Sequence, residues 1–334
     1  MTSGPSRLWF GGIAAGLVLA APLFGQEQPP TQTGTRLPDQ QAAETLGYLP
    51  DTTSRMTVPV NIGRQGPYRF VVDTGAERTV ISRELARELA LSPGRTATVH
   101  SMTEVSRIAT VVIPGLRIGS RTVNDIHAPA LARANLGASG MLGVDSLQRQ
   151  RVVFDFGRQE MTISPSARRE EIWPAGDIVV TGRRHFGRLV LVDAAVDGQR
   201  VWVIVDTGSQ ISIANSALRN ALQRRGRLGA THPIELMSIT GGRLTAEYTI
   251  ARRIQIGGVN IVRLPIAFAD VHPFRQLQLM DRPALLLGMD ALQLFDRVSV
   301  DFANHRVRVL LDDSSLQMPE PRMAGGRRGA RVAS

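Results

Sequence analysis

The tripeptide Asp-Thr-Gly occurs twice in this chain of 334 residues, at Asp73–Gly75 and at Asp206–Gly208. Each copy follows an apolar run, Phe70–Val72 in the first case and Val203–Val205 in the second. Such a run predicts a buried strand, so each aspartate is delivered from a core into a tight loop. Burying a carboxylate is costly unless another group compensates it. A second carboxylate that shares one proton would provide this compensation, because two adjacent carboxyl groups do not both ionise easily.

A pair of carboxyl groups of this kind has a specific chemistry. The ionised member accepts a proton from a water molecule held between the two, and the protonated member polarises a carbonyl group of the substrate. The pattern therefore predicts peptide-bond hydrolysis through a tetrahedral diol, with Asp73 and Asp206 as the catalytic residues. This chemistry needs neither a metal ion nor another cofactor.

Other features recur around the two tripeptides in the same order. A strand, a turn and a strand are predicted before each copy, with Gly66 and Gly198 in the turns. Nine residues after each aspartate stand Ser82 and Asn215, both of a type that caps helices, and each precedes a helical pattern. A further strand, glycine turn and strand follow in both halves. The chain therefore contains an internal duplication.

Each half closes with a Leu-Gly element, at Leu142-Gly143 and at Leu287-Gly288. The interval from the Asp-Thr-Gly aspartate to this glycine is 70 residues in the first half and 82 in the second. Most of the extra length lies in residues 269–284, and an insertion of this kind is expected in a surface loop.

Four further aspartates recur in the two halves. Asp145 and Asp290 precede short helical patterns, which favours helix N-caps over additional catalytic groups. Asp155 and Asp301 stand before aromatic residues and a turn, and we interpret them as structural. The catalytic pair therefore stays at two residues.

Together, the segments 70–82 and 203–215 and the two Leu-Gly elements resemble the aspartic proteases, specifically two retropepsin-like units fused in tandem. The resemblance implies an all-β fold, with two homologous retropepsin-like acid-protease β-barrel domains that form a pepsin-like bilobal pseudo-dimer. The expected domains span residues 51–165 and 175–311. The implied activity is that of an aspartic endopeptidase, a hydrolase acting on a peptide or protein substrate.

The same resemblance gives a supporting role to five residues beside the catalytic pair: Thr74, Gly75, Thr207, Gly208 and Ser209. The threonine hydroxyls would cross-link the two loops, and the glycines would let the backbones approach each other. Ser209 would help to orient a carboxylate through its hydroxyl, whereas the equivalent Ala76 has none. The two aspartates are therefore expected to play unequal roles.

The family closes a β-hairpin flap over its substrate, usually with glycines at the tip. Residues 237–248 fit this pattern, with Ile239 near the substrate and Gly241 and Gly242 at the tip. Residues 99–110 occupy the equivalent place in the first half and contain no glycine. We expect a first flap that is shortened, reshaped or lost.

Composition excludes several classes of chemistry. Cysteine and lysine are both absent, which removes thiolate nucleophiles, Schiff-base enzymes and the lysine-containing phosphate loop. All 39 basic residues are arginine and the formal net charge is +10, but these arginines are scattered and lack interleaved aromatic residues, so nucleic-acid binding is not predicted. The six histidines show no metal-ligand spacing.

The two ends of the chain have their own signals. Residues 1–25 place one arginine before the apolar run Leu8–Phe24, which is typical of a secretory signal and predicts export to the periplasm or the medium. A cleaved signal and an uncleaved anchor that tethers the protein to a membrane both fit this length. Residues 26–50 resemble a flexible leader, and residues 312–334 a disordered basic tail.

Two alternatives to a monomeric protease stay open at this point. The first is a catalytically inactive peptide-binding module of the cell envelope, which kept the cleft and lost a flap. The second keeps the chemistry but pairs each half with the same half of another chain. The duplication within one chain favours pairing of the two halves within a monomer.

Overall fold

The computed structural model describes residues 43–51, 55–147, 149–166, 178–185, 188–191, 194–304 and 306–310. The predicted N-terminal signal or anchor, the first part of the leader and the basic tail lie outside these residues. Among the helices of the described residues, none is long and apolar enough to cross a membrane.

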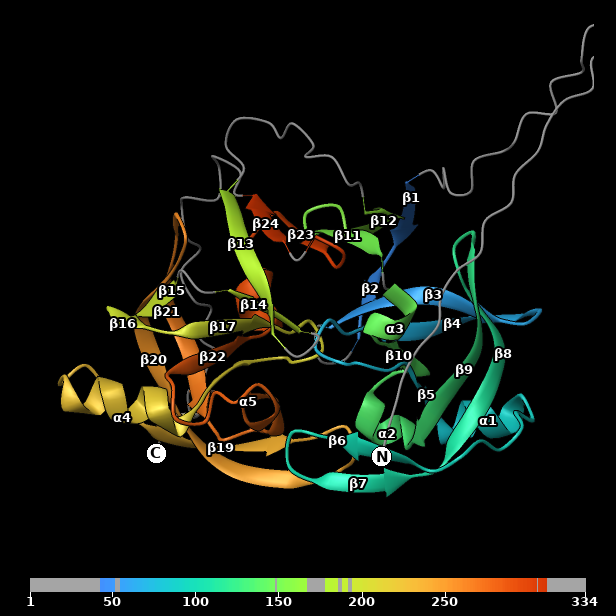
Figure 1. Ribbon diagram of the computed structural model, residues 1–334, viewed down its shortest axis with the longest axis horizontal. Helices are drawn as coiled ribbons and strands as arrows, with labels where there is room; N and C mark the ends of the chain where they lie inside the picture. The colour runs from blue at the N-terminus through green and yellow to red at the C-terminus, as the bar shows by residue number, and fades with distance from the viewer. Residues whose placement is uncertain are drawn as a thin grey trace, which may run out of the picture. The chain divides into compact units, whose positions relative to one another are not determined.

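The first half is built around a seven-stranded sheet in the order β2-β3-β4-β10-β5-β9-β8, which β3 closes by also pairing with β8 (Figure 1). Its strands are β2 (Leu49–Pro50), β3 (Met56–Ile62), β4 (Gln65–Val72), β5 (Val80–Ser82), β8 (Thr110–Ile118), β9 (Arg121–Leu131) and β10 (Gly140–Leu142). Three short helices accompany them: α1 (Arg83–Glu88), α2 (Arg133–Leu136) and α3 (Val144–Leu147).

The second half repeats this arrangement, in the order β13-β14-β17-β22-β18-β21-β20-β15-β16, with β19 paired to β20. Its strands are β13 (Ile178–His185), β14 (Arg188–Leu191), β15 (Ala194–Val196), β16 (Gln199–Arg200), β17 (Trp202–Val205), β18 (Ser212–Ala214), β19 (His232–Met237), β20 (Arg243–Ile256), β21 (Val259–Phe268) and β22 (Ala284–Leu287). Its helices are α4 (Ser216–Arg224), α5 (His272–Gln276) and α6 (Met289–Leu292).

Strand pairing shows that the halves are copies of one unit. β4 runs parallel to β10, with Val72 opposite Leu142, and β17 runs parallel to β22, with Val205 opposite Leu287. The next strand of each half, β5 or β18, lies antiparallel to that partner and parallel to β9 or β21. The prediction of an all-β, duplicated fold with two retropepsin-like domains is confirmed.

A third group of strands joins the two halves in the order β1-β12-β11-β23-β24-β13. It contains β1 (Glu44–Gly47), β11 (Gln150–Asp155), β12 (Glu160–Pro165), β23 (Arg297–Asp301) and β24 (Arg306–Leu310). Each half contributes its closing hairpin. β1 lies at the outer edge, whereas β13 pairs with both β24 and β14, so this group of strands continues into the sheet of the second half. Residues 44–50 are therefore part of the fold, and the leader predicted over residues 26–50 extends too far.

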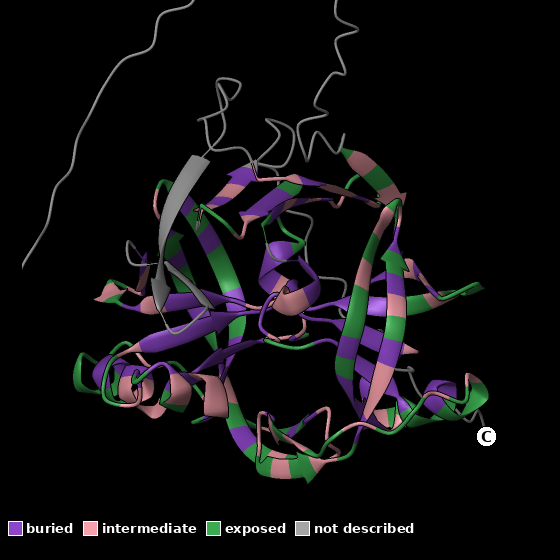
Figure 2. Ribbon diagram, turned by 45° about the vertical axis from the view of Figure 1, so that its right-hand side comes forward, coloured by how far each residue is buried: buried purple, intermediate pink, exposed green. Residues whose placement is uncertain are grey.

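The core consists mainly of strand residues that face inward. Figure 2 shows buried strand segments, in purple, in the middle of the described part and exposed segments at its outer turns. Phe70, Val71 and Val72, which lead into the first Asp-Thr-Gly, are fully buried, and Val203–Val205 are buried to nearly the same extent. Both Asp-Thr-Gly loops therefore begin in a rigid, close-packed environment.

One predicted turn lies elsewhere. Gly198 is in the turn between β15 and β16 with a positive φ of 77°, as predicted, but the corresponding turn of the first half falls at Gly63 and Arg64. Gly66 lies inside β4 with a φ of 124°, next to an irregularity in the register of β3 and β4. A backbone conformation of this kind strongly favours glycine.

The two predicted helix caps are confirmed. The Ser82 hydroxyl accepts a hydrogen bond from the Leu85 amide at 3.1 Å, and the Asn215 side-chain oxygen accepts one from the Leu218 amide at 2.9 Å. Asn215 makes three further bonds, because its oxygen also accepts from an amide of β22 and its nitrogen donates to two carbonyls of the insertion. Asn215 thus holds the insertion against the core.

We predict that Asn215→Ala destabilises the protein by about 3 kcal/mol or more, because it strands several buried backbone groups. Ser82→Ala removes chiefly one cap bond and should cost about 1 kcal/mol. Urea unfolding of both variants measures the difference. An equal loss of stability in the two variants would show that the additional hydrogen bonds of Asn215 do not stabilise the protein.

Candidate active site

The two Asp-Thr-Gly loops are cross-linked by their threonines. The Thr74 amide donates to Thr207 Oγ1 at 3.0 Å, and the Thr207 amide donates to Thr74 Oγ1 at 3.2 Å. In turn, Thr74 Oγ1 donates to the Val205 carbonyl at 3.1 Å, and Thr207 Oγ1 donates to the Val72 carbonyl at 2.7 Å. Both threonines are buried, so each hydroxyl both donates and accepts across the junction of the halves.

The glycines bring the aspartates together. A Cβ atom at Gly75 would lie 2.6 Å from the carboxylate carbon of Asp206, and one at Gly208 would collide with the carboxylate of Asp73. Each glycine therefore lies directly against the opposite aspartate, and no larger residue fits there without displacing a carboxylate. The structure places Asp73 and Asp206, which are 133 residues apart in the sequence, in one site.

Backbone amides orient the two carboxylates in the same way. Asp73 Oδ1 accepts hydrogen bonds from the amides of Gly75 and Ala76, at 2.7 and 3.0 Å. Asp206 Oδ1 accepts from the two equivalent amides, at 2.9 and 3.2 Å. Because main-chain groups provide these bonds, the identity of the residue after each glycine is not important for them.

The expected role of the Ser209 hydroxyl is wrong in detail. Ser209 Oγ donates to the Ile211 carbonyl at 2.8 Å, and only the Ser209 amide reaches Asp206. The two aspartates differ instead in their exposure, because Asp73 is 8% exposed and buried whereas Asp206 is half-buried.

The Leu-Gly elements support both loops from behind. The Asp73 amide donates to the Leu142 carbonyl at 3.0 Å, and the Val144 amide donates to the Ala76 carbonyl at 2.8 Å. The equivalent bonds of the second half measure 3.0 and 2.9 Å. Gly143 packs against the backbone of Arg78, where a Cβ atom would collide. The glycine of this element is therefore required by close packing.

Asp145 and Asp290 are not helix N-caps, contrary to the prediction. Each is the second residue of its short helix, and Gly288 occupies the N-cap position of α6. Asp145 accepts hydrogen bonds from the amide and hydroxyl of Thr79, at 2.9 and 2.7 Å. Asp290 accepts from the amide and hydroxyl of Ser212, at 3.0 and 2.8 Å. Both carboxylates thus fasten the end of an Asp-Thr-Gly loop.

The sequence contained a signal for this contact. A hydroxyl residue follows the aspartate of each Asp-Thr-Gly at the same interval, as Thr79 and as Ser212, and the Asp145 and Asp290 positions also correspond. Two polar residues that recur in register in both repeats indicate a shared hydrogen bond. Asp155 and Asp301, interpreted as structural, bind backbone amides in the turns that follow them.

Burial raises the pKa of the Asp290 carboxyl above its ordinary value, and the hydrogen bonds from Ser212 offset only part of this effect. The folded protein therefore binds a proton at Asp290 more readily than the unfolded chain does. Asp145 makes analogous contacts at the equivalent position of the first half.

Both flaps are present as hairpins, and they meet along the lower edge of the view in Figure 1. The second flap consists of β19, β20 and the turn between them, in which Gly241 has a φ of 92°. The first flap is a short hairpin of β6 (Ala97–His100) and β7 (Val105–Ile108). Of the outcomes expected for it, a shortened flap is the one observed.

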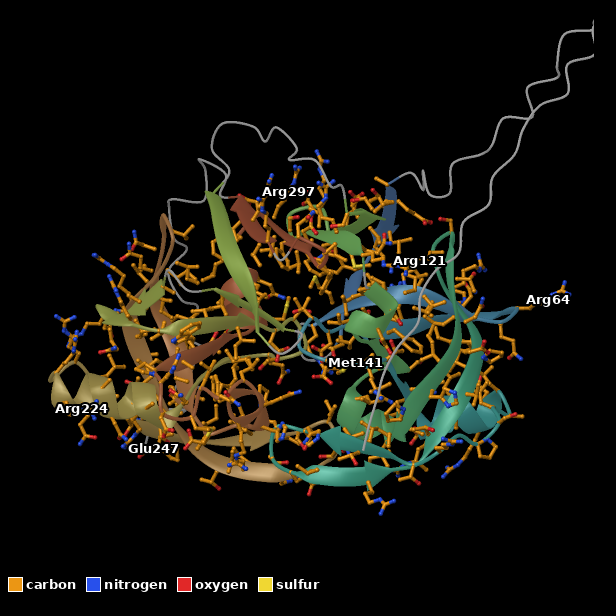
Figure 3. All side chains as sticks on the ribbon, viewed as in Figure 1. Arg64, Arg121, Met141, Arg224, Glu247 and Arg297 are labelled. Atoms are coloured by element: carbon orange, nitrogen blue, oxygen red, sulfur yellow. The ribbon has the colours of Figure 1, made fainter. Side chains whose placement is uncertain are left out.

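Ile239 of the second flap reaches into the first half. It packs against a buried apolar cluster that Ala76 also contacts, formed by Val71, Val80, Leu131, Leu136, Ala138 and Met141. Met141 is labelled in the interior in Figure 3, whereas Arg64 and Arg224 project from the periphery. The second flap therefore packs on the same apolar cluster as the residue that follows the first Asp-Thr-Gly.

Among the described residues, no three histidine, aspartate or glutamate side chains gather in a group that could hold a metal ion. The site is thus a pair of carboxylates, held by backbone amides and flanked by two flaps.

Two family models match the chain, one in each half. Residues 58–149 match a family described as gag-polyprotein putative aspartyl protease, and residues 192–291 match a family described as aspartyl protease. Each matched segment contains one of the two Asp-Thr-Gly loops. None of the curated proteins matches this sequence.

We predict that Thr207→Val destabilises the protein by about 2 to 4 kcal/mol, because it leaves the Thr74 amide and the Val72 carbonyl buried without their partner. Thr207→Ser keeps the hydroxyl and should stay within about 1 kcal/mol of the parent. Chemical unfolding of the two variants measures this. A similar loss in both would mean that the methyl group, and not the hydroxyl, stabilises the junction.

A second prediction concerns pH. Because the pKa of Asp290 is raised in the folded state, the stability linked to it is present below its unfolded pKa and lost as the pH rises through the folded pKa. We therefore expect the stability of the parent, relative to Asp290→Asn, to decrease between about pH 3 and pH 7. Altered hydrogen bonding in the variant changes its free energy of unfolding by the same amount at every pH. The prediction therefore concerns only how the stability difference between the two proteins changes with pH. Parallel stability curves would contradict this prediction.

Proposed function

Because the chain belongs to the aspartic proteases, as two aspartyl protease domains in tandem, we propose that it is an endopeptidase with one catalytic pair, Asp73 and Asp206. The observation that carries this proposal is the reciprocal contact of the glycines, each of which lies against the opposite aspartate. A contact of this kind serves no purpose in either domain alone. It supports a site that exists only when both halves are paired.

The proposed mechanism follows from the pair. One carboxylate is ionised and accepts a proton from a water molecule, whose oxygen forms a bond to the scissile carbonyl carbon. The other carboxyl group donates its proton to the carbonyl oxygen, which gives a neutral tetrahedral diol. Collapse of the diol breaks the C–N bond, and the amine leaves with a proton from the site. The amides that hold Asp73 Oδ1 and Asp206 Oδ1 fix the carboxylates during these steps.

We propose an extended segment of a peptide or an unfolded protein as the substrate. Two flaps cover the region of the catalytic loops, and Ile239 packs on the same apolar cluster as Ala76, so a folded domain would have to displace both hairpins. A single extended strand requires much less displacement.

We further propose that the protein acts as a monomer. The four hydrogen bonds between the threonine loops form within one chain, and the joining sheet contains the closing hairpins of both halves. These contacts give each half its partner within the same chain, so no second copy of the chain is required. They disfavour the arrangement in which each half pairs with its counterpart in another molecule.

The competing function is a peptide-binding module without turnover. The lack of glycine in the first flap favoured this function. Because β6 and β7 nevertheless form a hairpin there, the lack of glycine is a weaker argument for it. No contact within the described part of the site distinguishes the two functions, so an activity assay has to decide.

We predict cleavage of a peptide library by the purified protein, strongest at the acidic end of a range from about pH 3 to pH 7, since one aspartate must be protonated. Asp73→Asn and Asp206→Asn should each reduce kcat by about 10³-fold or more. Asp125→Asn is the matched control, because Asp125 is exposed and remote in sequence from both loops, and it should retain full activity.

Turnover by Asp206→Asn at the rate of the parent would refute the proposal. Peptide binding without cleavage by any form of the protein, unaffected by Asp73→Asn, would establish the binding module instead.

A further inference from the structure

The first flap lacks the sheet support that the second flap has. β6 and β7 have four residues each and form a separate two-stranded sheet. The second flap continues from β20, a strand of 14 residues that pairs with β21 along most of its length. An isolated two-stranded hairpin is at best marginally stable in water. The first flap therefore depends on contacts outside its own sheet.

Those contacts come from the opposite half. Met102, in the turn of the first flap, packs against an apolar cluster of the second half that includes Val271, Phe274, Leu277 and Leu279. The Met102 carbonyl accepts a hydrogen bond from the His272 amide at 3.4 Å. The rings of His100 and His272 stack with their centroids 4.2 Å apart.

His272 and the four named cluster residues belong to the insertion, residues 269–284, which lengthens the second repeat and contains α5; the rest of the cluster comes mainly from the strands of the second half. The insertion is firmly anchored, because the four cluster residues named above are almost completely buried and Asn215 binds two of its carbonyls. It was expected in a surface loop, but its apolar side is part of the core. It therefore provides a fixed platform for the first flap.

The tip of the second flap is linked to the first flap through side-chain hydroxyl groups. Thr103 Oγ1 donates to Ser238 Oγ at 3.1 Å, and Thr240 Oγ1 donates to Ser101 Oγ at 3.1 Å. Ser238 and Thr240 are themselves linked at 2.7 Å, which completes a chain of four hydroxyl groups. Such neutral bonds are individually weak. The adjacent Gly241 and Gly242 give this turn more conformational freedom than the glycine-free turn of the first flap has.

We propose that the insertion of the second repeat is a docking element for the first flap. The insertion holds this flap through Met102, which acts as the positioning residue. In the free protein, the first flap is fixed in its closed position by residues 269–284. The substrate enters when the hydroxyl groups of the two tips separate and the second flap moves at its glycines. The passage of a substrate rests on the proposed function, whereas the docking of the flap does not.

Hydrogen exchange followed by mass spectrometry, on the protein without substrate, tests this proposal. In the parent, amides of the first flap, residues 97–108, should exchange more slowly than those of the turn 238–242. Met102→Ala should accelerate exchange in residues 97–108 on the order of tenfold, because it removes the side chain that docks on the insertion. Met102→Leu should restore protection.

Val105→Ala is the matched control, since Val105 lies in the same hairpin and is 56% exposed. It should leave the exchange of residues 97–108 unchanged. Thr240→Val removes one of the two hydrogen bonds between the tips, the one to Ser101, and should accelerate exchange in the turn 238–242 only.

Unchanged protection in Met102→Ala, or faster exchange of the first flap in Thr240→Val, would overturn the proposal. The second result would mean that the hydroxyl groups, and not the insertion, hold the first flap. Because exchange is measured without turnover, a protein that cleaves no peptide still reveals whether the first flap is docked on the insertion. Conversely, a protein that cleaves peptides but shows the exchange of an undocked first flap would support the proposed function and contradict the docking.

Discussion

The reciprocal hydrogen bonds between Thr74 and Thr207 are the constraint on which the site depends. Each threonine uses its hydroxyl both to accept from the opposite loop and to donate to the strand that delivers that loop. Only with the backbones at this separation do Gly75 and Gly208 touch the opposite carboxylates. The cost of burying the charge of one aspartate is thereby coupled to the position of the other.

The duplicated β framework maintains this geometry. In each half, a Leu-Gly element accepts a bond from the amide of the Asp-Thr-Gly aspartate, and the carboxylate of Asp145 or Asp290 secures the end of the loop. The joining sheet then fixes one half against the other through β11 and β23. The two halves differ in the exposure of the aspartates, the insertion and the two unlike flaps.

Much of this could be predicted from the sequence. The Asp-Thr-Gly loops, the caps Ser82 and Asn215 and the turn at Gly198 depend on local chemistry, and the duplication made each pattern visible twice. The hydroxyl of Ser209 could not be placed in this way, because a serine side chain reaches either the carboxylate or the Ile211 carbonyl, and only the rotamer decides. The role of α5 was also beyond prediction, since its partner Met102 is far away in the sequence and belongs to the other half.

The proposal that the two Asp-Thr-Gly loops of one chain form a single active site can be tested by binding. Its most direct test is the titration calorimetry of a non-cleavable peptide in which a hydroxyl-bearing tetrahedral carbon replaces the scissile carbonyl. Such a transition-state mimic binds at least about 100-fold more tightly than the matching substrate. We predict one bound peptide per chain, with the tight binding lost in Asp73→Asn and in Asp206→Asn alike. Two bound peptides per chain, or full affinity in either variant, would contradict the account.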